Sequence, residues 1–406
     1  MIEAKAALTR VPGFRAVGVT CGLKVSGKPD LALVLADRPC TAAAVFTTNH
    51  FKAAPVLYDM ALIQRAAHAL RGVIVNAGNA NAVTGEQGLL NAATMAHLTE
   101  EACGLPADSI FVMSTGVIGE PLPMDKVRAG VRQAGDLIQT EAGQQGQNAV
   151  QAIMTTDLVP KEAFVQITVG GREVKLAGMA KGSGMIHPDM ATMLAVLVTD
   201  AVIEPGVLDQ ALRLAVGRSF HRVTVDGDTS TNDTVLVLAS GGAEHSPLEA
   251  GSPDFETFVT GLSDVCIQLA KAVARDGEGA TKLIEITVRG ARTEAEAAAA
   301  ARTIAISPLF KTAVFGNDPN WGRVFMALGR APTEVDPRQV SLWLGDFHLV
   351  DRSEPLAFDE TAAHNWLAAS TEISLVVDLA LGSSQATVWT CDYSYKYVEI
   401  NAEYHT

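Results

Sequence analysis

Cysteine is scarce in this chain of 406 residues, and histidine forms no cluster. The five cysteines are an odd number, lie far apart and include no CxxC pair, which favours buried thiols over a disulfide framework or a zinc site. The nine histidines include no HExxH motif and no other closely spaced set. We therefore expect no metal site built on these residue types.

Long apolar runs and basic blocks are also missing. No run of 18 apolar residues occurs, which predicts that no helix crosses a membrane, and the first residues, MIEAKAALTRVPGFRA, lack the apolar core of a signal peptide. The formal net charge of −14, without a basic block or an aromatic stripe, disfavours nucleic acid as a partner. We expect a cytoplasmic protein that binds neither a membrane nor nucleic acid.

Apolar residues are abundant: they make up 48% of the chain and are spread along its whole length. Strand-like runs alternate with segments of helical period, and no low-complexity linker separates them. This pattern predicts an α/β or α+β protein whose halves pack together. The expected strands span residues 30–37, 41–48, 72–78, 163–169, 172–176, 222–225, 234–239 and 283–290, with mostly strand patterns after residue 323. The expected helices span residues 60–70 (capped by Asp59), 89–102, 205–220 and 293–301, with a further helix that opens at Pro253.

Two polar loops follow predicted strands. The loop NAGNANAVTG holds Asn76, Asn79 and Asn81, whose side chains suit turns because they bond nearby backbone groups. The loop DGDTSTND, from Asp226 to Asp233, is rich in carboxylates but lacks the spacing and the closing glutamate of an EF-hand. We expect structural roles for both loops and no cation site in the second.

The most informative stretch is AGMAKGSGMIHPDMATMLAVLVTDA, residues 177–201. Its first half is rich in glycine and turn-like, whereas residues 193–198 form an apolar run typical of a buried strand. Thr192 lies between the two, although a threonine at the start of a strand is often only a β-branched strand residue. The neighbouring KGSG lacks the GxxxxGK[ST] spacing of a phosphate loop, and Ser183 is not in a GxSxG elbow.

The segment KGSGMIHPDMATML resembles the signature of the ornithine acetyltransferase family, the bifunctional or monofunctional glutamate N-acetyltransferases of arginine biosynthesis. The resemblance covers nearly the whole chain. Further similar segments follow in the same order: GLKVSGKPDLALVLAD, TTNHFKAAPV, VNAGNANAVTG, STGVIGEPLPM, DGDTSTND, DGEGATKLIE, GNDPNWGR and YVEINAEYHT.

The resemblance implies a precursor that cuts itself before its nucleophilic threonine, here between Ala191 and Thr192. The pieces would be residues 1–191 and 192–406. A threonine hydroxyl needs a base and a stabilised oxyanion to act as a nucleophile. Attack by the Thr192 hydroxyl on the Ala191 carbonyl would give an ester that water opens. The freed α-amino group of Thr192, with a usual pKa of ~7.7–8.0, could then serve as the base.

The resemblance also assigns an oxyanion hole and substrate contacts. Thr115 and Gly116 match the family's oxyanion hole, although Thr-Gly alone is typical of a turn that ends a strand. Lys181 is expected to meet an α-carboxylate and Glu278 the side-chain ammonium of ornithine. Without the resemblance these would be a solvated Lys and Glu, and the chain end a frayed tail. The implied substrate contacts are Thr155 (or Thr156 beside it), Lys181, Thr192, Glu278, Asn401 and Thr406.

The implied reaction is a ping-pong transfer of acetyl from N-acetylornithine to Thr192 and then to glutamate. It would need no metal or organic cofactor, and whether acetyl-CoA is a second donor stays open. The implied fold is a self-cleaved assembly of αββα-type layers, whose intertwined pieces associate as an α₂β₂ heterotetramer. Two alternatives remain: an N-terminal-nucleophile amidohydrolase or aminopeptidase of related fold, and an uncleaved binding protein without catalysis.

Overall fold

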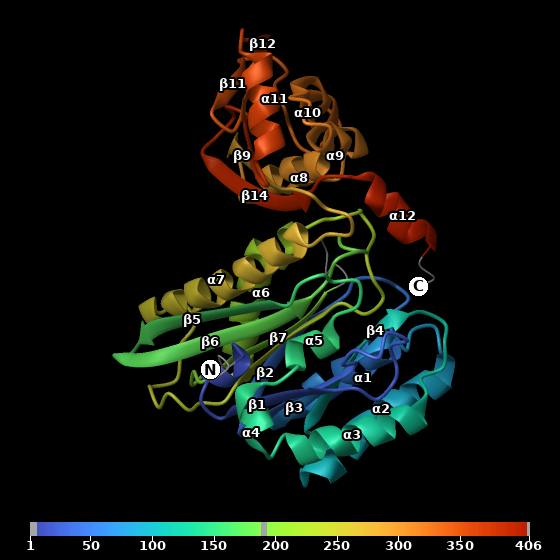
Figure 1. Ribbon diagram of the computed structural model, residues 1–406. Helices are drawn as coiled ribbons and strands as arrows, with labels where there is room; N and C mark the ends of the chain where they lie inside the picture. Colours follow the sequence, from blue (N-terminus) through green and yellow to red (C-terminus); the bar gives the residue numbers. More distant parts are fainter. Residues whose placement is uncertain (1–5, 188–192, 404–406) are drawn as a thin grey trace.

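The computed structural model describes residues 6–187 and 193–403 of the chain. The chain folds into a larger and a smaller part (Figure 1). The larger part ends with its longest helix, α7 (Pro253–Arg275), and the smaller part follows. The last helix, α12 (Tyr395–Glu403), leaves the smaller part and returns toward the larger one (Figure 1). The predictions for Ala191, Thr192 and Thr406 fall outside the described residues.

Eight strands of the larger part form one hydrogen-bonded sheet in the order β4-β3-β2-β8-β7-β6-β5, with β1 paired to β2. The strands are β1 (Phe14–Val19), β2 (Leu31–Phe46), β3 (Leu70–Asn79), β4 (Ile110–Val117), β5 (Lys161–Val169), β6 (Arg172–Lys181), β7 (Leu194–Thr199) and β8 (Thr234–Ala239). The helices besides α7 are α1 (Ala54–Ala66), α2 (Gly85–Cys103), α3 (Met124–Leu137), α4 (Glu141–Gln145), α5 (Ala149–Ile153) and α6 (Pro205–Arg218), with 3-10 turns at Leu8–Arg10 and Phe220–Arg222.

Strand β2 connects two halves of this sheet. Its first residues, 31–36, pair with β1 and β3, whereas residues 41–46 pair with β8. The expectation of two separate strands here was therefore wrong, because the exposed residues 37–39 belong to one continuous strand.

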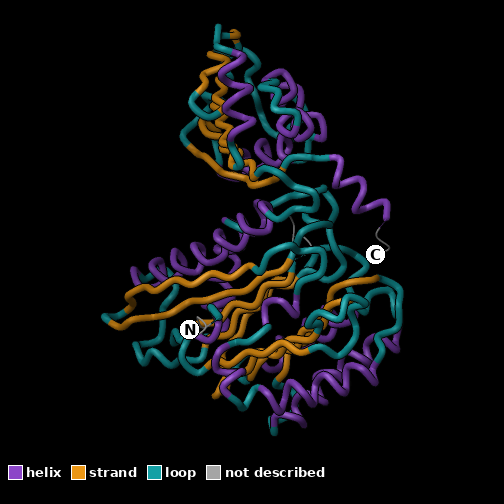
Figure 2. The backbone as a smooth tube through the Cα atoms, viewed as in Figure 1, coloured by secondary structure: helices purple, strands orange, loops and turns teal. Residues whose placement is uncertain are grey.

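The two halves stack face to face, and helices cover their outer faces (Figure 2). Val34 of the first half and Leu236 of the second belong to one buried cluster that lies between the halves. On one outer face Leu197 packs in a cluster with α6 and α7, and on the other Leu33 packs in a cluster with α2 and α3. This order of helix, sheet, sheet and helix confirms the expected α/β class and αββα-type layers.

Helix α7 covers β5 and β6 on the outer face. It begins where the Ser252 hydroxyl accepts a hydrogen bond from Phe255 N at 3.1 Å, with Pro253 in the first turn, as the sequence predicted. Among the described residues, α7 is the one helix long and apolar enough to cross a membrane. Phe258, Leu262 and other side chains of its apolar face are buried against the sheet, which is the placement of a core helix.

Three local expectations were wrong. The helix expected at residues 60–70 is α1, which begins at Ala54, and Asp59 does not cap it. The Asp59 carboxyl is buried and its Oδ1 accepts a hydrogen bond from Val112 N at 3.0 Å. Residues 222–225 make only an isolated bridge, between Val223 and Trp389, and Val225 N instead donates to the carbonyl of Ile186.

The smaller part is a six-stranded sheet in the order β12-β11-β10-β13-β9-β14, with four helices packed on it. Helices α10, α11 and α12 lie in the region where strand patterns were expected. The strands are β9 (Leu283–Ala291), β10 (Ser341–Leu344), β11 (Phe347–Asp351), β12 (Glu354–Pro355), β13 (Glu372–Asp378) and β14 (Ser384–Cys391). The helices are α8 (Glu294–Ala305), α9 (Pro308–Phe315), α10 (Trp321–Leu328) and α11 (Glu360–Ala369).

Candidate active site

A cavity that opens to solvent lies where β4, β6, the loop after α7 and the helix α12 meet, with about 630 Å³ of space when the open solvent at its mouth is included. Six residues that the sequence singled out line it together, although they come from five separate segments of the chain. These are Thr115, Gly116, Thr155, Lys181, Glu278 and Asn401. Thr156, the alternative to Thr155, lines the cavity too. The roles given to Ala191, Thr192 and Thr406 stay predictions, because these residues are outside the described part of the chain.

Glycine is required at position 116 by the backbone. Gly116 has a φ of +134°, which L side chains rarely adopt, and it pairs with Gly78 where β4 runs beside β3. A Cβ at this position would lie 2.3 Å from the carbonyl carbon of Gly78. The close approach of the two strands therefore leaves room for backbone alone beside Thr115.

The asparagines expected in a turn support this strand end, and two of them, Asn76 and Asn79, lie within β3 itself. Ser114 Oγ donates a hydrogen bond of 2.6 Å to Asn76 Oδ1, and Asn76 Nδ2 donates to the carbonyl of Asn79 at 2.8 Å. Asn79 Oδ1 accepts a hydrogen bond from Asn81 N at 2.8 Å. Buried amide side chains thus satisfy backbone groups that would otherwise be unpaired at the edge of the cavity.

Lys181 is the buried cation of the site, at the last position of β6. Its side chain is 3% exposed, and Nζ donates a hydrogen bond of 3.2 Å to Thr115 Oγ1. Burial lowers the pKa of Lys181, and the negative charge of Asp157 opposes that effect. An ammonium has three donors, so the contact with Thr115 leaves others for a substrate carboxylate.

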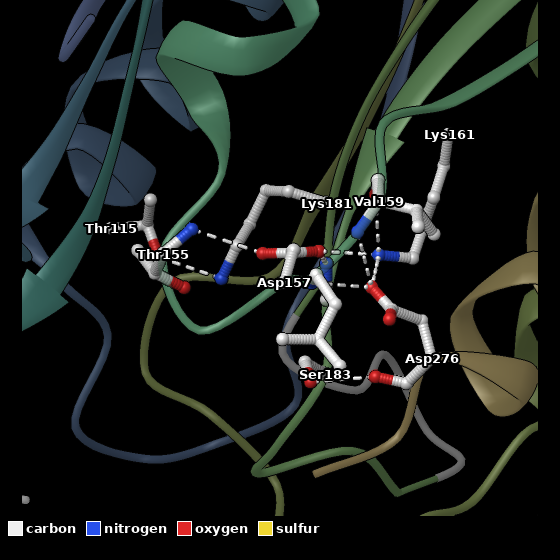
Figure 3. Close-up of polar contacts among 10 residues, drawn as sticks. Thr115, Thr155, Asp157, Val159, Lys161, Lys181, Ser183 and Asp276 are labelled. Atoms are coloured by element: carbon white, nitrogen blue, oxygen red, sulfur yellow. Dashed lines mark hydrogen bonds and ion pairs between the residues drawn. The ribbon is translucent and has the colours of Figure 1, made fainter. Parts of the chain in front are cut away.

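Three charged residues behind Lys181 were not singled out from the sequence (Figure 3). Lys161 Nζ contacts Asp157 Oδ1 at 2.7 Å and Asp276 Oδ2 at 2.5 Å. Although burial opposes it, the positive charges of Lys181 and Lys161 lower the pKa of Asp157 to about 2. The available signal was weak: Asp157 follows the predicted contact Thr155 by two positions, and Asp276 precedes Glu278 by two.

Glu278 forms the opposite side of the cavity. Its backbone N donates to the Ser183 carbonyl at 2.9 Å, and its Oε2 accepts a hydrogen bond from Asn401 Nδ2 at 2.9 Å. A Cβ on Gly184 would lie 2.4 Å from Glu278 Cδ, so the glycine makes space for this carboxylate. A carboxylate held in this way can receive the ammonium of a small substrate.

The loop DGDTSTND contributes a wall that sequence reasoning treated only as structural. Ser230, Thr231 and Asn232 line the cavity. Asn232 Nδ2 donates to the carbonyls of Ala80 and Ser114, at 2.7 and 2.8 Å. The amide of Asn232 therefore joins this loop to the strand end that carries Thr115.

Two aspartates of the same loop, the half-buried Asp226 and the buried Asp233, hold the described residues on either side of the predicted cleavage point. Asp226 accepts hydrogen bonds from Met185 N at 2.5 Å and Ile186 N at 2.9 Å, and burial raises its pKa to about 6. Asp233 Oδ1 accepts from Met193 N at 3.0 Å, and burial raises its pKa well above the usual value.

The arrangement as a whole suits a small zwitterionic substrate. A hydroxyl, an ammonium and a carboxylate line one cavity, and hydrogen bonds within the protein fix the positions of these groups. Within residues 6–187 and 193–403, no group of three or more His, Cys, Asp or Glu side chains is placed to hold a metal ion.

Known proteins match this chain along its length. A model of the ArgJ family matches residues 15–406. The arginine biosynthesis bifunctional protein ArgJ of Symbiobacterium thermophilum is 49% identical over 401 residues, and the match covers 98% of each chain. The protein of the same name from Gloeobacter violaceus is 47% identical over 400 residues, with 98% of each chain covered. A crystal structure of ArgJ from Bacillus halodurans is 44% identical with a TM-score of 0.50, and the match covers 50% of this chain and 96% of that one.

Proposed function

The chain belongs to the ArgJ family and is an enzyme of arginine biosynthesis, and on this premise we propose that it transfers an acetyl group from N-acetylornithine to glutamate through Thr192. The family resemblance drawn from sequence segments is confirmed by the family match. The observation that carries the proposal is the meeting of Thr115, Gly116, Lys181 and Glu278 at one cavity.

The proposed first half of the reaction forms an acetyl-enzyme. The Thr192 hydroxyl attacks the acetyl carbonyl of N-acetylornithine while its proton passes to the Thr192 α-amino group. The oxygen that gains negative charge is stabilised by the Thr115 hydroxyl and the Gly116 amide. The amide C–N bond then breaks, the departing nitrogen takes the proton, and ornithine leaves.

The proposed second half regenerates the enzyme. The neutral amine of glutamate attacks the acetyl ester, its proton returns to the Thr192 oxygen as the C–O bond breaks, and N-acetylglutamate leaves. Lys181 supplies a positive charge for the α-carboxylate, and Glu278 a negative charge for the ornithine ammonium. Because the reacting groups are side chains and termini, the proposal includes no metal or organic cofactor.

The precursor is proposed to cut itself between Ala191 and Thr192, giving pieces 1–191 and 192–406. The match to the solved Bacillus halodurans chain covers 96% of that chain but 50% of this one, as expected if that chain is one piece of a cut precursor. The proposal extends to an assembly of two copies of each piece in the cytoplasm. The word bifunctional in the relatives' name agrees with acetyl-CoA as a second donor.

The test is product analysis with N-acetylornithine in the presence and absence of glutamate. The proposal expects N-acetylglutamate and ornithine in equal amounts, with little acetate when glutamate is absent. Acetate released at the same rate without glutamate would instead identify an amidohydrolase. Acetyl-CoA replaces N-acetylornithine in a parallel reaction, and Thr192→Ala is the control that should neither process nor transfer acetyl.

A further inference from the structure

A buried pair of opposite charges lies directly behind the cavity without lining it. The side chains of Asp157 and Lys161 are both 0% exposed, and Asp276, the second partner of Lys161, is 5% exposed (Figure 3). Burying such a pair costs desolvation energy that the mutual attraction often only offsets. The network therefore adds little to the free energy of unfolding by itself, and its contacts show which parts of the cavity it positions.

Asp157 connects two walls of the cavity through its two oxygens. Oδ2 accepts a hydrogen bond of 3.0 Å from Thr155 N, and Oδ1 accepts one of 2.7 Å from Gly182 N, the residue after Lys181. Lys161 Nζ also donates to Oδ1. One carboxylate thus fixes the backbone at Thr155 and directly beside Lys181, while Lys161 fixes the carboxylate.

The position of Lys181 decides how the Thr115 hydroxyl is oriented. An ammonium can only donate, so in the 3.2 Å contact the Thr115 oxygen accepts. The proton of the Thr115 hydroxyl is then free to point at another acceptor. In an oxyanion hole that acceptor is the acyl oxygen, which gains charge in the transition state.

Resting on the proposed acetyl transfer, we propose that Asp157 is a positioning residue of the oxyanion hole, which holds the Lys181 ammonium against Thr115 so that the Thr115 hydroxyl donates to the acyl oxygen. Asp157 touches neither the cavity nor the reacting atoms. It acts through the Gly182 amide and through its charge on Lys181.

The charge on Lys181 gives this role a pH signature. Burial lowers the pKa of Lys181, the charges of the neighbouring carboxylates oppose that, and the charge of Lys161 adds to it. The charged ammonium can act only as a donor to Thr115, and this orients the Thr115 hydroxyl. Because that constraint is lost when Lys181 loses its proton, kcat falls as pH rises through the pKa of Lys181. Removing the charge of Asp157 lowers the pKa further and moves this alkaline limb to lower pH. The charged groups that act on Lys181 are Asp157, Lys161, Asp233, Glu278 and Lys24.

The experiment compares Asp157→Asn with Asp276→Asn in fully processed enzyme. Both variants remove one carboxylate partner of Lys161, but only Asp157 also accepts a hydrogen bond from the backbone beside Lys181, at Gly182 N. For Asp157→Asn we expect a kcat at least tenfold lower, a smaller change in KM, and an alkaline limb shifted down by at least half a pH unit. For Asp276→Asn we expect the limb at the wild-type position. Lys181→Arg should remove the limb, because arginine does not deprotonate.

Several outcomes would overturn the assignment. An unshifted limb in Asp157→Asn, an equal shift in Asp276→Asn, or a limb that persists in Lys181→Arg each contradict it. If Asp157→Asn does not yield folded, processed protein, Asp157→Glu carries the test: the retained charge should keep the limb in place while the longer side chain lowers kcat, and full kcat would contradict the role. A wild type that forms no N-acetylglutamate refutes the proposed function instead.

Discussion

The side chains of Glu278 and Asn401, 123 positions apart in the sequence, are joined by a hydrogen bond of 2.9 Å from Asn401 Nδ2 to Glu278 Oε2. Helix α12 has no buried residue, so this bond and the close approach of Gly279 to Tyr397 attach it to the cavity. A substrate ammonium at Glu278 would share the carboxylate with Asn401. Binding of such an ammonium would therefore be coupled to the position of the last helix.

The first prediction concerns processing. Mass spectrometry of the purified enzyme should find two pieces, one ending at Ala191 and one beginning with Thr192, because the hydroxyl and the scissile carbonyl are adjacent in the chain. The Thr192→Ala protein should remain a single chain. Full activity in a preparation that contains only uncut chain would contradict the proposed mechanism.

Thr115→Val should affect turnover more than binding. The substitution keeps the shape of the side chain but removes a donor that matters most when the oxyanion forms, so kcat should fall by about 10²–10³-fold. KM should change by only a few-fold in steady-state assays of processed enzyme. A large rise in KM with unchanged kcat would show that the hydroxyl is a substrate contact and leave Gly116 as the main donor.

Gly116→Ala should inactivate the enzyme and lower its melting temperature. The added Cβ would lie 2.3 Å from backbone of β3, which cannot move without breaking the sheet. Gly119→Ala is the matched control: Gly119 also has a positive φ, +85°, but has no atom within 4 Å of a Cβ. The control should lose only the free energy of backbone strain at a positive φ, about 1–2 kcal/mol, and should keep its activity. Equal losses in both variants would refute the argument from close approach.

Gly184→Ala should weaken substrate capture. The new Cβ would meet the carboxyl of Glu278 at 2.4 Å and push that flexible side chain away from its place at the cavity. KM for N-acetylornithine should rise about tenfold or more, while the melting temperature changes little. Gly206→Ala, on helix α6 with open space around it, is the control and should behave as wild type. An unchanged KM would mean that Glu278 does not contact this substrate.

The ionisation of Asp226 should lower the stability of the folded protein as pH rises through about 6. Its pKa is about 6 in the folded protein and about 4 in an unfolded chain, so the folded state holds more protons between these values. The stability of wild type relative to Asp226→Asn should therefore decline from pH 4 to pH 7, by at most about 3 kcal/mol at ~1.4 kcal/mol per pKa unit. Melting temperatures of both proteins across this range test it, and a constant or growing advantage of wild type would contradict it.

Local patterns predicted most elements of the larger part, because its strands and helices carry clear hydrophobic periods. They failed where distant partners decide the outcome. The polar residues 37–39 look like a break, yet pairing with β8 continues β2 beyond them. The position of Asp59 suggests a helix cap, but its carboxyl instead accepts a hydrogen bond from Val112 N of strand β4. Residues 395–403 have an alternating pattern, yet they form the helix α12, which has no buried residue.

The candidate site shows the same division. Thr115, Gly116, Lys181 and Glu278 lie in segments that resemble a known family, and they were named from the sequence. Asp157 was not, although it fixes two of the walls. Its partner Gly182 comes from another segment, and although Lys161 is only four positions away, a buried ion pair leaves no periodic signal in the sequence.

The strand order has a consequence for the two pieces. Of the strands in the larger sheet, β7 and β8 follow Thr192 in the sequence, yet they lie between β6 and β2, which precede it. After cleavage, β7 and β8 of the second piece would thus stay hydrogen-bonded on both sides to strands of the first piece. The two pieces would also share buried clusters. The cut enzyme should not lose a piece on dilution or exchange pieces between molecules, and it should unfold like a single polypeptide.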